Sequence, residues 1–351
     1  MLLNNIEQIE FERYTQVYDF SDYFNNKTFL ITGSKGIVGS GLTRWLLFEN
    51  SRKNCNTRII LSSRTPEKIP DYIEKGDNVT FCKFGEEDKI EEKIDYIIHT
   101  ASPTSNVVFK KQPVEALHTI VNGTKGILEV QRKQPSCSLI YLSSEEVYGT
   151  PKDKEAIPES FVGRIDSLNT RSSYPLGKKT AELMCRAYFE EYGLDTKIIR
   201  PTVIIGLYQP YDSVKIEAEI LRCIVENKDL YLKSSGTTKK TVIYTLDTIS
   251  AVFTVLFKGE SGQAYNATNP QTFNSVRDSA SLLFQKFNPN CKIVFPEQDT
   301  SSALGYLPER AMLEDISRIE SLGWKPMTSL EMIFRNEIQR FKHDKQNSHK
   351  A

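Results

Sequence analysis

Continuous runs of apolar residues alternate with longer amphipathic segments along the first part of the chain. The apolar runs lie at residues 27–32, 58–63, 79–84, 95–102, 138–144 and 196–206. Short apolar strands separated by helical segments are typical of a parallel sheet that helices cover on both faces. The pattern therefore predicts an α/β fold with a doubly wound parallel sheet.

Two of the helical segments are well marked. Residues 113–134 form the first and residues 173–192 the second. In the second, Ser172 or Ser173 can act as the N-cap, and Gly193 fits the C-terminal cap.

After residue 206 the regular alternation is lost, and helices, short strands and loops follow. We therefore expect four parts: an N-terminal extension (1–26) that packs on the first domain, a cofactor-binding domain (27–206), a smaller, mainly substrate-binding domain (207–341) with segments that return to the first domain, and a solvated tail (342–351).

Composition restricts the possible partners. The 351 residues include 45 Lys and Arg and 45 Asp and Glu, so the formal net charge is zero and gives no long-range attraction to nucleic acid or anionic lipid. No stretch reaches the roughly 18 apolar residues of a membrane helix, and the N-terminus lacks the features of a signal peptide. The six cysteines form no close pair. We expect a cytoplasmic protein with no membrane or nucleic-acid partner and no metal site.

A glycine-rich turn, TGSKGIVG, lies between the first strand and the first long helix. Gly33 allows a sharp turn, Gly36 lets backbone N–H groups approach a pyrophosphate, and Gly39 lets the helix pack closely on the strand. The helix N-terminus adds positive potential for phosphates. An ordinary glycine turn is the alternative, but the strand–turn–helix context predicts a Rossmann domain that binds NAD(P). The expected contacts are Gly33, Ser34, Gly36, Ile37, Val38 and Gly39.

The end of the second strand bears on the choice of cofactor. NAD sites usually have an acidic residue there for the ribose 2′-hydroxyl, whereas this chain has Ser62, Ser63 and Arg64. Arg64 can pair with a 2′-phosphate, which slightly favours NADP over NAD. Alternatively, Arg64 stacks on the adenine.

Tyr174 and Lys178 form a YxxxK pair on the second helix. Residues four apart lie on one face of a helix, and an ammonium one turn away favours the phenolate of a tyrosine, whose ordinary pKa is about 10. Ser144 follows the strand at 138–144. Because the carboxyl ends of parallel strands meet the ligand crevice, Ser144 can hydrogen-bond the hydroxyl that Tyr174 deprotonates.

The motifs TGSKGIVG, IIHTAS, SSEEVYG, YPLGK, RPTVIIG and LGWKP occur in this order from about residue 27 to about residue 340. In this the chain resembles the extended short-chain dehydrogenases/reductases of the NAD-dependent epimerase/dehydratase family. The stretch from SSEEVYG to the end of the YPLGK helix looks like that of UDP-glucuronate decarboxylases and nucleotide-sugar 4,6-dehydratases.

The resemblance implies that Tyr174 removes the proton of a sugar 4-hydroxyl, that Lys178 tunes Tyr174 and binds the nicotinamide ribose, and that Ser144 supports the proton transfer. It also implies a tightly bound cofactor, a nucleotide-diphosphate sugar as substrate, and a homodimer formed through the helices around 113–133 and 174–192. Further implied cofactor contacts are Thr100, Ala101, Ser102, Asn122 and Pro201. For Ser102 and Asn122, structural support is an alternative role.

Two adjacent acids, Glu145 and Glu146, bear on the reaction. The resemblance implies that Glu146 exchanges the C5 proton, which a 4-keto group makes acidic. Glu145 stands where dTDP-glucose dehydratases have the Asp that protonates the departing 6-hydroxyl and decarboxylases have Ser. A second carboxylate repels a substrate carboxylate, which argues against simple decarboxylation. Alternatively, one of the pair is a solvated surface acid.

One departure from the family pattern concerns substrate binding. Lys239 and Lys240 stand where the family generally has an Arg that contacts the diphosphate, and a lysine lacks the bidentate fork.

Three functions remain open. The first is a 4,6-dehydratase or decarboxylase-like lyase that acts through a 4-keto intermediate, in the synthesis of surface polysaccharide precursors. The second is a nucleotide-sugar epimerase or an NADPH-dependent 4-ketosugar reductase. The third is a non-catalytic NAD(P)-binding regulator, against which the intact Ser144, Tyr174 and Lys178 argue.

Overall fold

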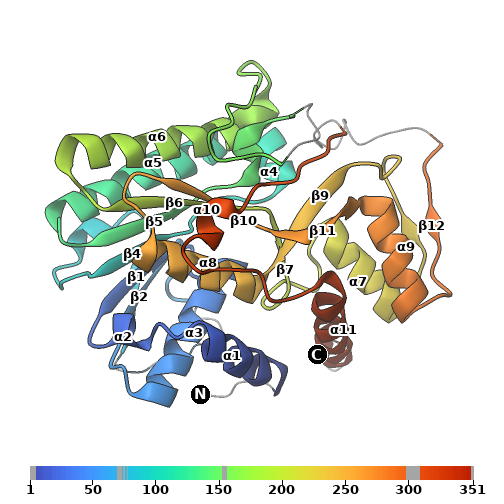
Figure 1. The fold of residues 1–351 in the computed structure, drawn as a ribbon, viewed down its shortest axis with the longest axis horizontal. Coiled ribbons are helices and arrows are strands. Elements are labelled where there is room, and N and C mark those ends of the chain that lie inside the picture. Colours follow the sequence, from blue (N-terminus) through green and yellow to red (C-terminus); the bar gives the residue numbers. More distant parts are fainter. Residues whose placement is uncertain are drawn as a thin grey trace.

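The computed structural model describes residues 5–68, 73, 76, 78–151, 156–297 and 309–348. Its centre is a seven-stranded sheet in the order β10-β6-β5-β4-β1-β2-β3, in which every neighbouring pair is parallel (Figure 1). The strands are β1 (Thr28–Thr32), β2 (Arg58–Ser63), β3 (Val79–Lys83), β4 (Tyr96–His99), β5 (Ser138–Leu142), β6 (Thr196–Pro201) and β10 (Ala264–Ala267). The predicted doubly wound sheet is confirmed. Its order reverses between β1 and β4, which is where such sheets bind ligands.

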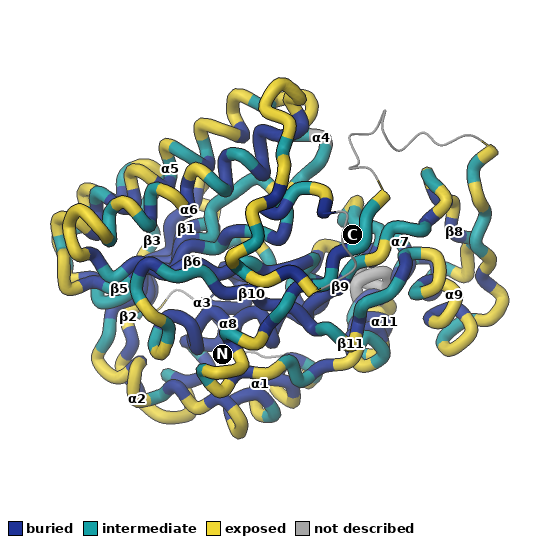
Figure 2. The backbone as a smooth tube through the Cα atoms, turned by 45° about the horizontal axis from the view of Figure 1, so that its top comes forward, coloured by how far each residue is buried: buried dark blue, intermediate teal, exposed yellow. Residues whose placement is uncertain are grey.

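Helices cover both faces of this sheet (Figure 1). Successive residues of β1 divide between two cores: Phe29 and Ile31 pack with α3 and α8, and Leu30 packs with α5 and α6. The first face carries α3 (Ile37–Lys53) and α8 (Thr245–Lys258), and the second carries α4 (Asn106–Lys111), α5 (Pro113–Lys133) and α6 (Ser173–Tyr192). Strands buried on both sides explain the continuous apolar runs in the sequence (Figure 2).

The N-terminal segment adds α1 (Asn5–Val17) and α2 (Ser21–Phe24) outside α3 and α8. It is held by more than apolar packing. Arg44 of α3 pairs with Glu7 at 2.6 Å, with both side chains buried, and the Tyr14 hydroxyl donates to Asp247 of α8 at 2.7 Å. Removing α1 would therefore take away the carboxylate that pairs with the buried Arg44 and the hydroxyl that donates to Asp247.

A second, smaller group of elements follows β6. Thr196–Ile205 is not one strand as we expected: Pro201 has no N–H to continue the ladder, and the chain turns there into a second sheet of order β11-β9-β7. The remaining elements are β7 (Val203–Ile205), α7 (Ile216–Glu226), β8 (Leu230–Tyr231), β9 (Lys239–Tyr244), β11 (Asn269–Ser275), α9 (Val276–Phe287), β12 (Ile293–Val294), α10 (Ser317–Glu320) and α11 (Leu330–Ser348).

The two groups of elements interleave along the chain, since α8 and β10 return to the first sheet between β9 and β11. Helix α11 runs to Ser348 and so includes much of the segment that we expected to be a tail. No helix of the described residues has the length and apolar character needed to span a bilayer.

Candidate active site

The glycine turn joins β1 to α3 at the point where the strand order reverses. Gly33 has a φ of +67°, and a Cβ there would lie 2.8 Å from the backbone nitrogen of Ala101, after β4. A Cβ on Gly39 would lie 2.4 Å from the Gly33 carbonyl oxygen. Helix α3 begins at Ile37, with Val38 next, and Gly36 precedes it in an extended conformation. The glycines thus let the backbone of the turn lie close to β1 and β4 and lead into the N-terminus of α3, which fits a pyrophosphate.

The end of β2 lies beside this turn. The backbone N–H and the hydroxyl of Ser34 both donate to the Ser62 carbonyl oxygen, at 3.3 and 3.2 Å. The Ser63 hydroxyl is buried and has no hydrogen-bond partner in the described part of the chain, and Arg64 is exposed just beyond it. The Ser63 hydroxyl and the exposed Arg64 guanidinium at this edge fit the adenine ribose of a dinucleotide.

A carboxylate also lies at this edge, although residues 62–64 contain none. Glu87, buried in the short helix η1 (Glu87–Lys89), accepts the Ser62 hydroxyl and the Gly85 N–H, the latter at 2.8 Å. Both of its oxygens are therefore engaged within the protein.

Tyr174, Lys178 and Ser144 meet at the carboxyl end of β5. Tyr174 and Lys178 lie on the first turns of α6, and Ser144 begins the short helix η2 (Glu145–Tyr148). Helix η3 (Thr170–Ser172) leads directly into α6, so Ser172 makes no side-chain cap, contrary to expectation. The Tyr174 ring stacks on Phe109 of α4, with ring centroids 4.4 Å apart.

The surroundings of Tyr174 and Lys178 oppose charge on either group. Burial, together with the charge of Glu146, raises the pKa of Tyr174, while a hydrogen bond from Ser144 lowers it. Burial lowers the pKa of Lys178 to about 7. The Lys178 ammonium donates to the Leu142 carbonyl oxygen at 2.6 Å and lies 5.8 Å from the Tyr174 ring centroid. Burial thus favours the neutral phenol of Tyr174, whereas Lys178 can change its protonation state near neutral pH.

Glu146 is held by a guanidinium that sequence analysis did not single out. Arg171 of η3 donates to both Glu146 oxygens, at 3.0 and 2.9 Å, and to the side-chain oxygen of Asn106 at 2.9 Å. The guanidinium also covers the Phe109 ring at 4.9 Å. This bidentate contact fixes the Glu146 carboxyl group close to Tyr174.

Glu145 is only 5% exposed, so the alternative of a solvated surface acid is wrong for this residue. Burial raises the pKa of its carboxyl, against the nearby Arg310 and Lys240 charges. Arg310 is 3.5 Å away and belongs to a segment far along the chain. Glu145 and Glu146 thus differ in their surroundings. Burial favours the protonated form of Glu145, whereas the carboxyl group of Glu146 is held by Arg171.

The end of β4 supplies the residues expected beside the nicotinamide. The Thr100 hydroxyl donates to the Thr32 carbonyl oxygen at 2.6 Å, Ala101 lies against Gly33, and Ser102 donates to Pro103. Pro201 is buried at the end of β6. His99 hydrogen-bonds Thr32 and Thr124 through its two ring nitrogens, and burial lowers its pKa to about 3, so it is a neutral core residue.

The expected contact from Asn122 is contradicted. Asn122 is exposed on α5, whereas Ile120 and Thr124 on the same helix are buried toward the sheet and α6. Residues two apart lie on different sides of a helix, so Asn122 points away from the Tyr174 and Lys178 pair.

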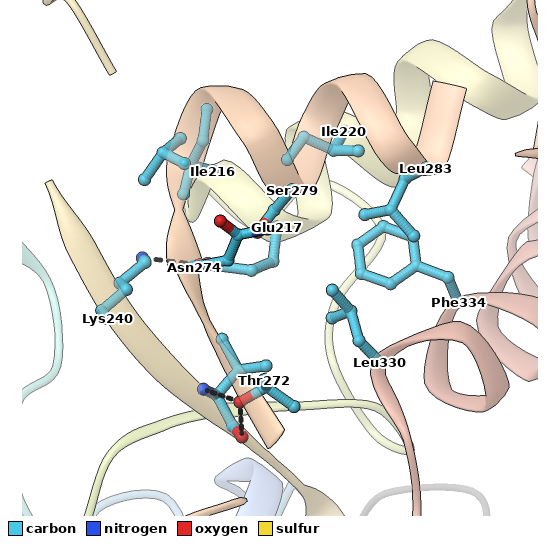
Figure 3. Close-up of a pocket in the computed structure, with 12 residues that line it drawn as sticks. Ile216, Glu217, Ile220, Lys240, Thr272, Asn274, Ser279, Leu283, Leu330 and Phe334 are labelled. Carbon is cyan, nitrogen blue, oxygen red and sulfur yellow. Dashed lines mark hydrogen bonds and ion pairs between the residues drawn. The ribbon is translucent and has the colours of Figure 1, made fainter. Parts of the chain in front are cut away.

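Lys239 and Lys240 begin β9. Lys239 is exposed, and Lys240 pairs with Glu217 of α7 at 2.6 Å, which lowers the pKa of Glu217 although burial raises it. Figure 3 shows this pair on the wall of a cavity of about 20 Å³, with Leu330 and Phe334 on the far side. The cavity has room for about one water molecule and not for a nucleotide base. The Lys240 charge is therefore already balanced within the protein.

Comparisons with known proteins agree with this geometry. The model of the NAD dependent epimerase/dehydratase family matches residues 29–268, well over half of the chain. The chain belongs to this family. UDP-glucuronic acid decarboxylase 5 of Arabidopsis thaliana is 25% identical over 309 residues, which cover 87% of this chain and 86% of the relative. The dTDP-D-glucose 4,6-dehydratase of Mus musculus is 27% identical over 269 residues, covering 74% and 72%.

Solved structures show the same fold. The UDP-glucuronic acid 4-epimerase of Bacillus cereus, in complex with UDP-glucuronic acid and NAD, superposes with a TM-score of 0.75 at 20% identity over 90% of this chain and 99% of its own. Membership of the epimerase/dehydratase family confirms the resemblance found in the motifs. It accounts for the glycine turn and for the YxxxK helix, and it leaves the particular reaction open.

Sequence analysis did not single out four charged residues that surround Glu145 and Lys240: Lys215, Glu217, Arg310 and Glu314. The tertiary fold brings them there from distant parts of the chain, and no local sequence pattern marks them. Arg171 is different, because a basic residue three positions before Tyr174 lies one helical turn away and could have been found.

Proposed function

We propose that this protein is an NAD(P)-dependent enzyme that oxidises C4 of a nucleotide-linked sugar and then processes the 4-keto intermediate, with dehydration across C5 and C6 as the first candidate. The observation that carries the proposal is the meeting of Tyr174, Ser144, Glu145 and Glu146 at the carboxyl end of β5. A regulator that only binds a cofactor has no need of two differently tuned acids there.

In the proposed reaction, Tyr174 accepts the proton of the 4-hydroxyl, and the Ser144 hydroxyl stabilises the phenolate by donating to it. Bound NAD(P)⁺ supplies the acceptor for the C4 hydride, and its positive charge favours the phenolate. Lys178 binds the nicotinamide ribose and stabilises the same phenolate. Glu146, held by the bidentate contact with Arg171, takes the C5 proton.

Glu145 favours dehydration over decarboxylation. A buried carboxyl with a raised pKa can give a proton to the departing 6-hydroxyl. Decarboxylation is the second candidate, supported by the similarity to UDP-glucuronic acid decarboxylases over most of the chain. Epimerisation and net reduction of a 4-ketosugar remain as further alternatives.

NADP is the slightly favoured cofactor in this proposal. The Arg64 guanidinium lies at the end of β2, and Glu87 is turned inward, with its oxygens engaged by Ser62 and Gly85. Arg64 can therefore pair with a 2′-phosphate.

We also propose a homodimer formed through α5 and α6. These adjacent helices expose large apolar side chains, with exposed fractions of 56% for Val114 and 67% for Leu183. A second copy would cover them, since soluble monomers rarely expose contiguous apolar faces.

The experiment that tests the function is incubation of the purified protein with UDP-, dTDP-, CDP- and GDP-sugars, followed by mass spectrometry. Loss of water from one sugar is the expected result, and loss of carbon dioxide would instead select the decarboxylase. A changed stereocentre without a change of mass would indicate an epimerase, and stoichiometric consumption of NADPH a reductase. If no sugar reacts, the enzymatic proposal fails.

A further inference from the structure

A charged groove lies beside β10, the edge strand of the main sheet. It has a volume of about 550 Å³ and is lined by residues of α6, β6, β10 and α10 (Figure 1). A groove of this volume admits a small-molecule ligand. None of the described residues that line it belongs to the glycine turn or to the pair of Tyr174 and Lys178. The charged lining residues are Glu159, Lys179, Glu182, Arg186, Arg200 and Arg318. Four cations thus share the groove with two acids.

The two acids of the groove are already engaged by protein groups. Arg200 donates to both carboxylate oxygens of Glu182, at 2.9 and 2.7 Å. Glu159 accepts the Asn266 N–H at 2.9 Å and lies 3.7 Å from the Arg318 guanidinium. Both carboxylates are largely buried, with exposed fractions of 10% for Glu182 and 5% for Glu159. Each acid therefore balances one of the two guanidinium groups next to it.

Lys179 is the first of the two remaining cations. Its ammonium donates to a neutral group, the Gly163 carbonyl oxygen, at 3.0 Å. Burial lowers the pKa of Lys179, and the charge of Arg200 lowers it further, although Glu182 raises it. Because the Glu182 carboxylate is engaged by Arg200, an anion from solution would offset the repulsion between Lys179 and Arg200.

Arg186 is the second remaining cation and lies on the same helix. It donates to the Gly262 carbonyl oxygen at 3.2 Å. Its ion-pair partner, Glu190, is 60% exposed and is not among the described residues that line the groove. Exposed ion pairs of this kind contribute little, so Arg186 can turn to a ligand. Lys179 and Arg186 are two helical turns apart on α6, which separates their Cα atoms by about 10 Å along the helix.

We propose that this groove is a binding site for a diphosphate group, free or carried by a nucleotide, and that Lys179 and Arg186 hold it. Two long cationic side chains at this spacing can reach both phosphates of a diphosphate, whereas a single phosphate meets only one of them. Arg318, 39% exposed on α10, adds positive potential to the same groove. The site is separate from the residues of the proposed reaction and does not depend on that reaction.

Isothermal titration calorimetry with inorganic pyrophosphate tests the site. The protein is first saturated with NADP, so that binding of pyrophosphate at the glycine turn does not contribute. We expect one site per chain in the wild type, and at least about tenfold weaker binding when Lys179→Ala is combined with Arg186→Ala. The matched control combines Lys228→Ala with Arg335→Ala, one exposed lysine and one exposed arginine that each pair with a glutamate outside the groove, and it should bind like the wild type.

Two further measurements complete the test. Titration with UDP identifies the source of the diphosphate: UDP binding that is tighter than that of pyrophosphate and is lost in the double alanine variant assigns the site to a nucleotide, and equal affinity assigns it to the free group. Lys179→Arg combined with Arg186→Lys keeps both charges and should keep most of the affinity. The proposal is overturned if pyrophosphate does not bind, if it binds the folded alanine variant as tightly as the wild type, or if the charge-conserving variant loses as much affinity as the alanine variant.

Discussion

Replacing Lys178 with methionine should abolish activity and make the cofactor-free protein more stable. Lys178 is 2% exposed, and its ammonium contacts the Leu142 carbonyl oxygen and the Tyr141 ring. No carboxylate pairs with it in the described residues, so its burial costs free energy that only bound ligand can offset. Methionine has a similar length and no charge.

The magnitude follows from the pKa of Lys178. Burial lowers it from the ordinary value of 10.5 to about 7, and at about 1.4 kcal/mol per pKa unit this corresponds to roughly 4 to 5 kcal/mol at neutral pH. Loss of the hydrogen bond to the Leu142 carbonyl oxygen offsets about 1.5 kcal/mol of this gain in stability. Lys178→Met should therefore raise the free energy of unfolding by about 2.5 to 3.5 kcal/mol.

The sign of the pH dependence gives a second test of the same prediction. Between pH 7 and 10.5 the unfolded state binds the Lys178 proton and the folded state does not, so wild-type stability gains from Lys178 as the pH rises. The variant lacks this contribution, and the difference between the two proteins should shrink toward pH 10. Urea denaturation of the cofactor-free proteins at several pH values measures it.

Lys197→Met is the matched control. Lys197 is also buried, but it pairs with Asp195 at 2.6 Å, and its removal should destabilise the protein. The reasoning would be refuted by a Lys178→Met variant that is less stable than wild type at pH 7 with the same dependence on urea.

Three further predictions concern other parts of the site. Arg171→Met should lower the free energy of unfolding by about 2 kcal/mol in urea titrations, because it removes the ion-pair partner of Glu146, whose side chain is only 17% exposed; an unchanged midpoint would contradict this. Arg64→Ala should weaken NADP binding about tenfold and NAD binding little, as fluorescence titration can show; equal losses would favour stacking on adenine. Leu183→Glu should convert the dimer to a monomer in light scattering, and a wild-type protein that is already monomeric would exclude the dimer.

The local sequence was sufficient to predict features whose residues lie close together in the chain. The turn of Gly33, Gly36 and Gly39 is fixed by neighbouring backbone, so the strand before it and the helix after it identify it. The same holds for Tyr174 and Lys178, which one helix carries at a spacing that needs no knowledge of the rest of the fold.

The remaining features depend on contacts between distant segments. No local pattern indicates that Arg310 approaches Glu145, or that Glu217 pairs with Lys240. The carboxylate at the end of β2 is likewise Glu87, from beyond β3. The prediction for Asn122 differs for another reason. The motif lies on the expected helix, but the helical register decides which of its residues faces the sheet, and Asn122 is exposed.

The central claim is that Tyr174 takes the proton of a sugar 4-hydroxyl while a bound nicotinamide is reduced. Stopped-flow absorbance after mixing the cofactor-loaded protein with a reactive sugar measures that step directly. We predict a transient of reduced nicotinamide in the wild type and its loss in Tyr174→Phe, with cofactor binding retained. An undiminished transient in Tyr174→Phe would contradict the assignment.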